Sequence, residues 1–254
     1  QTVPARNLTP ESFAELFVVS TPFPPDDRSV GYERGTAISK AWEEAATNAA
    51  LETAAYVVEH VNELAKTKSS DGDRAAKLQQ FCSRFAERGF RRPLTDEERQ
   101  LVVAQQFAEA PHPDVAVQRS VLLALLSPHF LYRELRGGND PFDVASRLSF
   151  SLWDSIPDQP LLDAAGRNEL RTPEQIRRQA ERMVRDARAE AKLREFLHQW
   201  LKMDQLHDLS KSEELFPGFN EIIVSDLRTS LDLALDDVIR GEGADYRQLL
   251  LADY

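Results

Sequence analysis

Ala145-Ser-Arg-Leu-Ser-Phe-Ser-Leu-Trp-Asp-Ser-Ile-Pro-Asp158 is the stretch that indicates how the second half of the chain folds. Its apolar residues Ala145, Leu148 and Leu152 recur at intervals of three or four, the period of one face of an α-helix. Trp153 ends this run, and Pro157 breaks it because proline has no amide hydrogen with which to continue a helix. We therefore predict a helix that ends near Trp153 and a short helix after Asp158.

The same helical signals recur on both sides of this stretch. Thr95-Asp-Glu-Glu98 and Thr172-Pro-Glu-Gln175 have the spacing of a capping box, in which the threonine and the residue three positions later bind each other's backbone amides. Helical periodicity also extends over residues 41–65 and 220–240. Phe17-Val-Val19 is the nearest approach to a strand and is too short to seed a sheet. The sequence predicts an all-α fold, a multi-helix bundle of amphipathic helices.

Gly137-Gly-Asn-Asp-Pro141 is the clearest internal boundary, since paired glycines form a turn and Asp140 can cap a helix that begins at Pro141. We expect an N-terminal helical region over residues 1–136 and a C-terminal helical region over residues 140–254, two helical subdomains packed together. The bulkiest apolar cluster at helical spacing is expected to form the C-terminal core: Leu193, Phe196, Leu197, Trp200 and Leu201. The last helix is expected to bury Ile223, Leu227, Leu231, Ala234, Leu235 and Val238.

Composition and charge exclude two classes of partner. The chain has 254 residues, a net charge of −11 and 42% hydrophobic residues, a composition typical of a globular protein. Its charge repels a phosphate backbone, and no local basic cluster with aromatic residues compensates, so we expect no nucleic acid partner. The longest apolar run, Val121–Leu126, is far shorter than the roughly 20 residues that cross a bilayer, so we expect no membrane span. The chain begins at Gln1 without a signal peptide, as expected of a processed export protein or of a fragment.

Cys82 is the only cysteine. A single cysteine excludes an internal disulfide and a Cys-x-x-Cys-His haem attachment site, so we expect no cofactor held by a motif of this chain. Phe81, Cys82 and Phe85 share one helical face, which favours a small buried thiol. The alternative is a disulfide to a cysteine of another chain.

Trp153, Asp154 and Asp158 are the first candidate functional residues. In a site, Trp153 would form a wall, and Asp154 or Asp158 would orient a ligand or act as a base. The competing interpretation makes Trp153 a core anchor and the two aspartates helix caps, and we favour it. The same two interpretations apply to His198 as a catalytic candidate and to Trp200 as a cofactor-binding one.

His198, Asp204 and His207 are the candidate metal ligands, because two imidazoles and a carboxylate suit zinc or a similar ion. The offset of six residues between His198 and Asp204 does not fit one helical face, so the set requires a helix end near Met203. A haem bound without covalent attachment would need axial ligands such as His129 and Met203. Each of these residues also fits a plain packing role.

Several blocks of the sequence resemble the helical domains of unknown function in large secreted proteins of planctomycetes and myxobacteria, many of which are cytochrome-associated. The blocks that carry this resemblance are Ala145–Asp158, Leu161-Leu-Asp-Ala-Ala165, Phe196-Leu-His-Gln-Trp-Leu201, Leu215-Phe-Pro-Gly-Phe219, Phe90-Arg-Arg-Pro-Leu-Thr-Asp-Glu-Glu98 and, more loosely, Phe23-Pro-Pro-Asp26 with Gly31-Tyr32. The resemblance implies an extracytoplasmic location, further modules beyond Leu249–Tyr254, and a c-type cytochrome, with its haem c, on a partner or neighbouring module.

Two functions follow from this resemblance. The first is a helical scaffold or interaction subunit of an exported, periplasmic or cell-surface redox assembly, in which aromatic and acidic faces bind other chains or modules. The second is part of an extracytoplasmic oxidoreductase or polymer-degrading enzyme whose active site is completed by another chain or module. The enzyme requires Trp153, Asp154, His198 and Trp200 to converge on one pocket.

Overall fold

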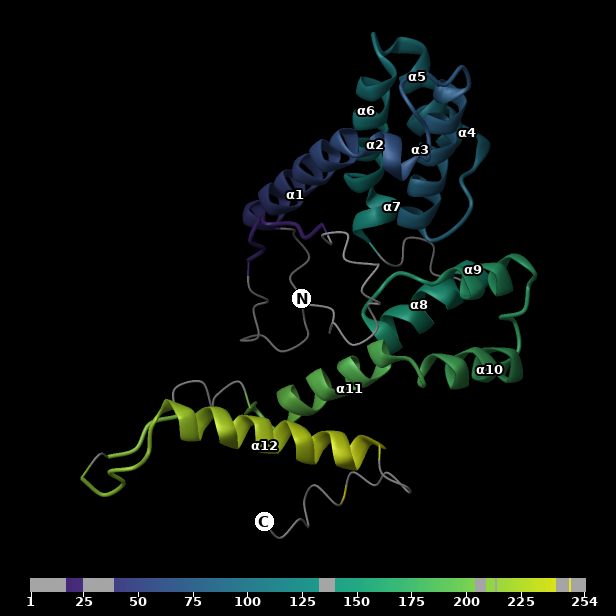
Figure 1. The fold of residues 1–254 in the computed structure, drawn as a ribbon. Coiled ribbons are helices and arrows are strands. Elements are labelled where there is room, and N and C mark those ends of the chain that lie inside the picture. The colour runs from purple at the N-terminus through teal and green to yellow at the C-terminus, as the bar shows by residue number, and fades with distance from the viewer. Residues whose placement is uncertain are drawn as a thin grey trace. The chain divides into compact units, whose positions relative to one another are not determined.

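The computed structural model describes residues 17–24, 39–132, 140–203, 209–212, 214–240 and 247. Every regular element among these residues is a helix (Figure 1), which confirms the predicted all-α class. The chain divides into two compact units, Gln1–Gly137 and Gly138–Tyr254.

The first unit consists of α1 to α7. Its helices are α1 (Lys40–Glu59), α2 (Val61–Leu64), α3 (Arg74–Phe90), α4 (Asp96–Arg99), the π-helix η3 (Gln100–Ala104), α5 (Gln105–Glu109), α6 (Pro113–Leu125) and α7 (Pro128–Leu131). The expected single helix over 41–65 is interrupted at His60. After α4, which the predicted capping box begins, the helix widens into the π-helix, a change that local sequence signals do not reveal.

The core of the first unit lies where α6 packs against α1 and α3. Ala54 of α1 and Ala86 of α3 are fully buried, and such small side chains allow close helix approach. Val117 and Val121 of α6 fill the space between. Cys82 is buried in the same cluster, and this burial raises the pKa of its thiol to about 12. A thiol in this position stays protonated at neutral pH, as the buried-thiol interpretation expects.

The second unit consists of five helices: α8 (Pro141–Trp153), α9 (Gln159–Gly166), α10 (Pro173–Met183), α11 (Ala187–Trp200) and α12 (Glu221–Arg240). The predicted caps form here. Asp140 accepts a hydrogen bond from the Phe142 amide, and Thr172 forms the capping box with Gln175. Residues 145–158 therefore form the last part of α8, its end at Trp153 and the cap of α9 at Asp158.

The core of the second unit differs from the prediction. It is built on α8, α9 and α10 around these buried residues: Ala145, Trp153, Leu161, Ala164, Ala165, Leu170 and Met183. In the expected cluster on α11, Leu197 alone is buried, whereas Leu193, Phe196, Trp200 and Leu201 are exposed. On α12, Leu235 is buried, but Ile223 and Leu227 are exposed. Helical spacing identified the apolar faces correctly, but it could not show which faces have a partner helix.

Some predicted features lie outside the described residues. They are the glycine turn at 137–139, Asp26, Gly31 and Tyr32 of the loosest block, the metal candidates Asp204 and His207, and the final residues 249–254.

Candidate functional site

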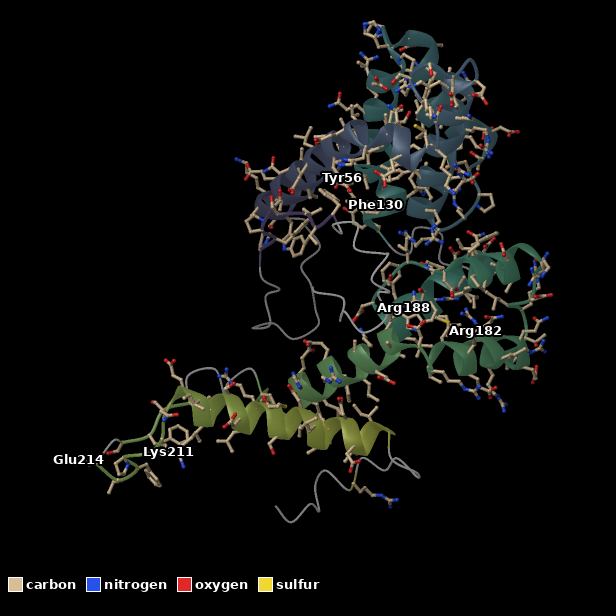
Figure 2. All side chains as sticks on the ribbon, in the orientation of Figure 1. Tyr56, Phe130, Arg182, Arg188, Lys211 and Glu214 are labelled. Carbon is tan, nitrogen blue, oxygen red and sulfur yellow. The ribbon has the colours of Figure 1, made fainter. Side chains whose placement is uncertain are left out.

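Trp153 is the centre of the second unit. Its side chain is buried, and its indole Nε1 donates a hydrogen bond of 3.0 Å to the carbonyl oxygen of Met183 at the end of α10. The guanidinium carbon of Arg188 lies 3.5 Å from the centroid of the ring, and that of Arg182 lies 5.7 Å away. Figure 2 labels both arginines in the region of α8 and α10. The indole is therefore held by one backbone acceptor and by cation–π contact.

Two aspartates hold these arginines in place. Asp158 caps α9 by accepting the Leu161 amide at 3.0 Å, and it accepts two hydrogen bonds of 2.7 and 3.0 Å from Arg182. Asp186 caps α11 and binds Arg188 through both carboxylate oxygens, at 2.8 Å each. The Arg188 hydrogen bond lowers the pKa of the Asp186 carboxyl. Each aspartate thus joins a helix end to an arginine that contacts the indole.

Asp154 ends α8 in the left-handed conformation, with φ of 49°. Its carboxylate forms an ion pair of 2.5 Å with Lys192 of α11. Left-handed backbone is strained for residues other than glycine, and aspartate and asparagine are among those that tolerate it best. Asp154 therefore turns the chain sharply after Trp153 and connects that turn to α11.

His198 points toward α12, where its Nε2 lies 2.7 Å from an oxygen of Asp232. One turn earlier on α11, Arg194 binds Asp236, an interaction that raises the pKa of the arginine. These two pairs run in opposite directions along the two helices, so α11 and α12 are antiparallel, as Figure 1 also shows. Trp200 projects elsewhere: it is 46% exposed and stacks on Phe196 with a centroid distance of 6.4 Å.

The structure brings some candidates together and separates others. Trp153 and Asp158 share Arg182 as a common partner. Asp154, Asp158 and His198 have three different partners, which are Lys192, Arg182 and Asp232 respectively. The favoured interpretation, a core anchor flanked by capping aspartates, therefore agrees with their geometry. Sequence reasoning missed Arg182 and Arg188, because nothing in their local pattern indicates a partner about 30 residues upstream.

A second group of paired side chains lies in the first unit, in the block Phe90–Glu98. Arg91 is buried, and its guanidinium donates to the carbonyl oxygens of Gly89, His129, Phe130 and Tyr132 at 2.7 to 3.3 Å. The last three of these acceptors lie in or just after α7. One side chain thus satisfies backbone groups at the ends of two helices that are far apart in sequence.

Arg92 and Glu98 form a bidentate ion pair, with hydrogen bonds of 2.6 and 2.7 Å. Glu98 also completes the capping box with Thr95. His129 Nε2 lies 3.2 Å from Glu98 Oε1, an oxygen that also accepts a hydrogen bond from Arg92. The Arg92 hydrogen bonds lower the pKa of Glu98 to about 2. The capping box predicted here is confirmed, but the arginine partner could not be read from spacing alone.

The haem and metal candidates are more scattered. His129 lies in the first unit, beside Glu98 and against the ring of Phe90 at a centroid distance of 5.2 Å. Met203 is half-buried just after α11 in the second unit. Within the described ranges, no group of three or more histidine, cysteine, aspartate or glutamate side chains could hold a metal ion. Since Asp204 and His207 lie outside those ranges, the predicted metal set stays a prediction.

Exposed apolar side chains occur on both helices of the α11–α12 pair, and those of α12 include Ile222 and Leu233. One set of them lies away from the Arg194–Asp236 and His198–Asp232 pairs. It comprises Leu193, Phe196 and Trp200 on α11 with Ile223 and Leu227 on α12, and we call it the hairpin face. Phe196 is 56% exposed and Leu227 is 51% exposed. Large exposed apolar side chains on one side of a helix pair are typical of contact surfaces.

Two families match the sequence. Residues 140–254 match the family described as PSD4, protein of unknown function (DUF1592). Residues 77–134 match the family described as PSD5, protein of unknown function (DUF1595). The second unit is thus similar to PSD4 proteins. No curated protein and no solved structure matches the chain.

The PSD5 match spans α3 to α7 and includes Arg91, Arg92 and Glu98, while the PSD4 match includes the Trp153 cluster and the hairpin face. Both descriptions leave the activity open. In the described part of the chain, no helix is long and apolar enough to cross a bilayer.

Proposed function

We propose that this chain is a helical scaffold and interaction module of a larger assembly, and that the hairpin face is where it binds another chain or module. The observation that carries this proposal is the contrast in the second unit between polar residues that bind within the unit and large apolar residues that are exposed. Asp154 and Asp158 form ion pairs that join helices, and His198 binds Asp232 of α12, whereas Phe196, Trp200 and Leu227 are about half exposed.

The physical cost of the exposed face supports the same proposal. Exposure of apolar area costs about 25 cal/mol per Å² relative to burial, so five large apolar side chains on one surface favour association with something that covers them. A protein that works alone gains nothing from this exposure. A protein that binds a partner recovers the burial on binding.

The nature of the assembly is the second part of the proposal. From the resemblance to cytochrome-associated secreted proteins, we propose an exported, periplasmic or cell-surface redox assembly, in which haem c belongs to a partner or a neighbouring module. The chain has one cysteine and no haem attachment motif, so any electron transfer would depend on that partner.

The test uses the complete protein in its native cells, with the double variant Phe196→Ser/Leu227→Ser. We expect this variant to fold. The amount of partner recovered by affinity purification should fall at least about tenfold, because loss of two apolar contacts typically costs more than about 1.4 kcal/mol of binding free energy. Haem absorbance in the material recovered with the wild type tests the redox part. The matched control is Leu101→Ser, which removes an exposed leucine of the first unit.

Equal recovery of partner by Phe196→Ser/Leu227→Ser and by the control would contradict the docking role. Recovery of a partner without haem would contradict the redox assignment alone. Turnover of a substrate by the isolated chain, lost in His198→Ala while the fold is intact, would support the enzyme instead.

A further inference from the structure

We infer that the partner of the hairpin face is a protein surface that carries lysine or arginine residues around an apolar centre. This inference rests on the proposed docking function and adds the chemistry of the partner. Three features of the described residues lead to it: the side of the helix pair on which the apolar residues lie, the acidic residues at their edge, and the charge of the chain.

The apolar residues of the two helices lie on the same side of the pair. At roughly 100° per residue, Arg194 and His198 lie to one side of Leu197 on α11, and the apolar residues of the hairpin face lie to its other side. On α12, Asp232 and Asp236 stand in the same relation to Leu235. Because the helices are antiparallel, the Arg194–Asp236 and His198–Asp232 pairs occupy one side of the helix pair and the two apolar stripes lie on the other.

Acidic residues border this surface on α12. Continuing around the helix from Ile223, the next exposed positions are Ser230, Asp237 and Asp226. Asp232 and Asp236 are already paired with α11. Asp226 and Asp237 are exposed, and they lie between Ile223 and two further exposed apolar residues of α12, Ile222 and Leu233. Exposed carboxylates that border apolar side chains are complementary to a surface in which basic residues border apolar ones.

The charge of the chain favours a basic partner over a second copy. The whole chain carries a net charge of −11, and α12 has five acidic residues against two arginines. Two copies that met through this surface would bring like charges together at its edge, which disfavours association. A basic partner would instead be attracted over a distance of about 10 Å at moderate salt.

The test measures binding of three synthetic amphipathic helices of roughly 18 residues, each with the same leucine face and with lysine, glutamine or glutamate as its polar residues. Fluorescence anisotropy of labelled peptides gives the affinity, and the emission of Trp200, identified with Trp200→Phe, reports contact with the hairpin face. We expect the lysine peptide to bind at least about tenfold more tightly than the glutamine peptide, and the glutamate peptide to bind least. Raising sodium chloride from about 0.05 to about 0.5 M should remove most of this preference.

Two variants separate apolar from electrostatic contributions. Asp226→Asn/Asp237→Asn should reduce the preference for lysine over glutamine by about threefold to tenfold and leave binding of the glutamine peptide unchanged. Its matched control, Asp163→Asn/Glu181→Gln, removes two exposed carboxylates of the same unit away from α12 and should leave the preference intact. Phe196→Ser/Leu227→Ser should weaken binding of all three peptides.

The outcomes distinguish this inference from the proposed function. Equal affinity for the lysine and glutamine peptides, lost in Phe196→Ser/Leu227→Ser, would overturn the basic partner and leave the docking role standing. Binding that Phe196→Ser/Leu227→Ser does not weaken would contradict both. A dimer in sedimentation experiments that the same variant abolishes would show that a second copy occupies the face, which also overturns the inference.

Discussion

Two regions of the molecule differ in whether their large side chains are bound within their own unit or exposed. They are residues 90–98 of the first unit, which we call the corner, and the α11–α12 pair of the second unit. In the corner, Arg91 donates hydrogen bonds to backbone carbonyl groups, and Arg92 forms an ion pair with Glu98. In the helix pair, the polar residues bind across the two helices while the bulky apolar residues remain exposed. The described contacts of the corner join helices of the first unit, whereas the helix pair has exposed large apolar side chains.

This difference predicts that the two regions contribute to two different properties, the stability of the fold and the binding of a partner. Residues of the corner should govern the free energy of unfolding of the first unit, and residues of the hairpin face should govern association. Four substitutions test this division.

Arg91→Leu should destabilise the first unit most, by about 3 kcal/mol, because the carbonyl oxygens of α7 lose their shared donor and a buried site loses its shape. Urea unfolding followed by circular dichroism measures the change. Arg84→Leu, an exposed arginine of the same helix, is the control and should change stability by less than about 0.5 kcal/mol. Similar losses in both variants would mean that the Arg91 hydrogen bonds add nothing to stability.

Trp153→Phe should destabilise the second unit by about 2 kcal/mol, since phenylalanine keeps the apolar ring but cannot donate to the Met183 carbonyl and offers a weaker face to Arg188. Trp200→Phe makes the same chemical change on the hairpin face and serves as the matched control. Thermal unfolding of both proteins should give a lower midpoint for Trp153→Phe alone. Equal midpoints would contradict the assignment of Trp153 as the anchor of this core.

Glu98→Gln should cost about 1 to 3 kcal/mol at neutral pH, with a defined dependence on pH. The pKa of Glu98 is lowered to about 2 in the folded protein, so its contribution is fully present above the unfolded value near 4.3. The contribution is lost as the pH falls through this window toward 2. The stability difference between wild type and Glu98→Gln should therefore be constant above about pH 5 and shrink at pH 4 and pH 3. A difference that does not change with pH would show that the Arg92 pair does not act through ionisation.

Leu227→Ser should have the smallest effect on stability, within about 0.5 kcal/mol, because this side chain is exposed and loses little burial on substitution. Leu235→Ser on the same helix removes a fully buried side chain and should cost several times more. Guanidinium unfolding of the two variants makes the comparison. A large loss in Leu227→Ser would place this residue in the core and would remove the basis of the hairpin face.

Local signals made much of the fold predictable. The capping boxes at Thr95 and Thr172, and the proline-led start of α8, depend on residues within four positions of each other. Such contacts form in the helix itself, so the sequence shows them directly. The end of α8 at Trp153 is visible for the same reason.

The candidate site was less predictable because its contacts are long-range. Trp153, Asp158 and His198 were identified from the sequence, but their partners Arg188, Arg182 and Asp232 lie 24 to 35 positions away. Helical spacing also gave the apolar faces of α11 and α12 without showing that they would stay exposed. Periodicity reports which side of a helix is apolar, and it contains no information on whether another element covers that side.

The sequence by itself determined the helical class, the capped ends of the helices and the single buried thiol, because each follows from residues close together in the chain or from composition. Tertiary structure alone decided which arginines contact Trp153 and that Arg91 binds the carbonyl groups at α7. It also decided that the apolar side of α11 and α12 is exposed. The physical reason is that burial and ion pairing depend on which helix faces meet, and that choice is made by the packing of the whole unit.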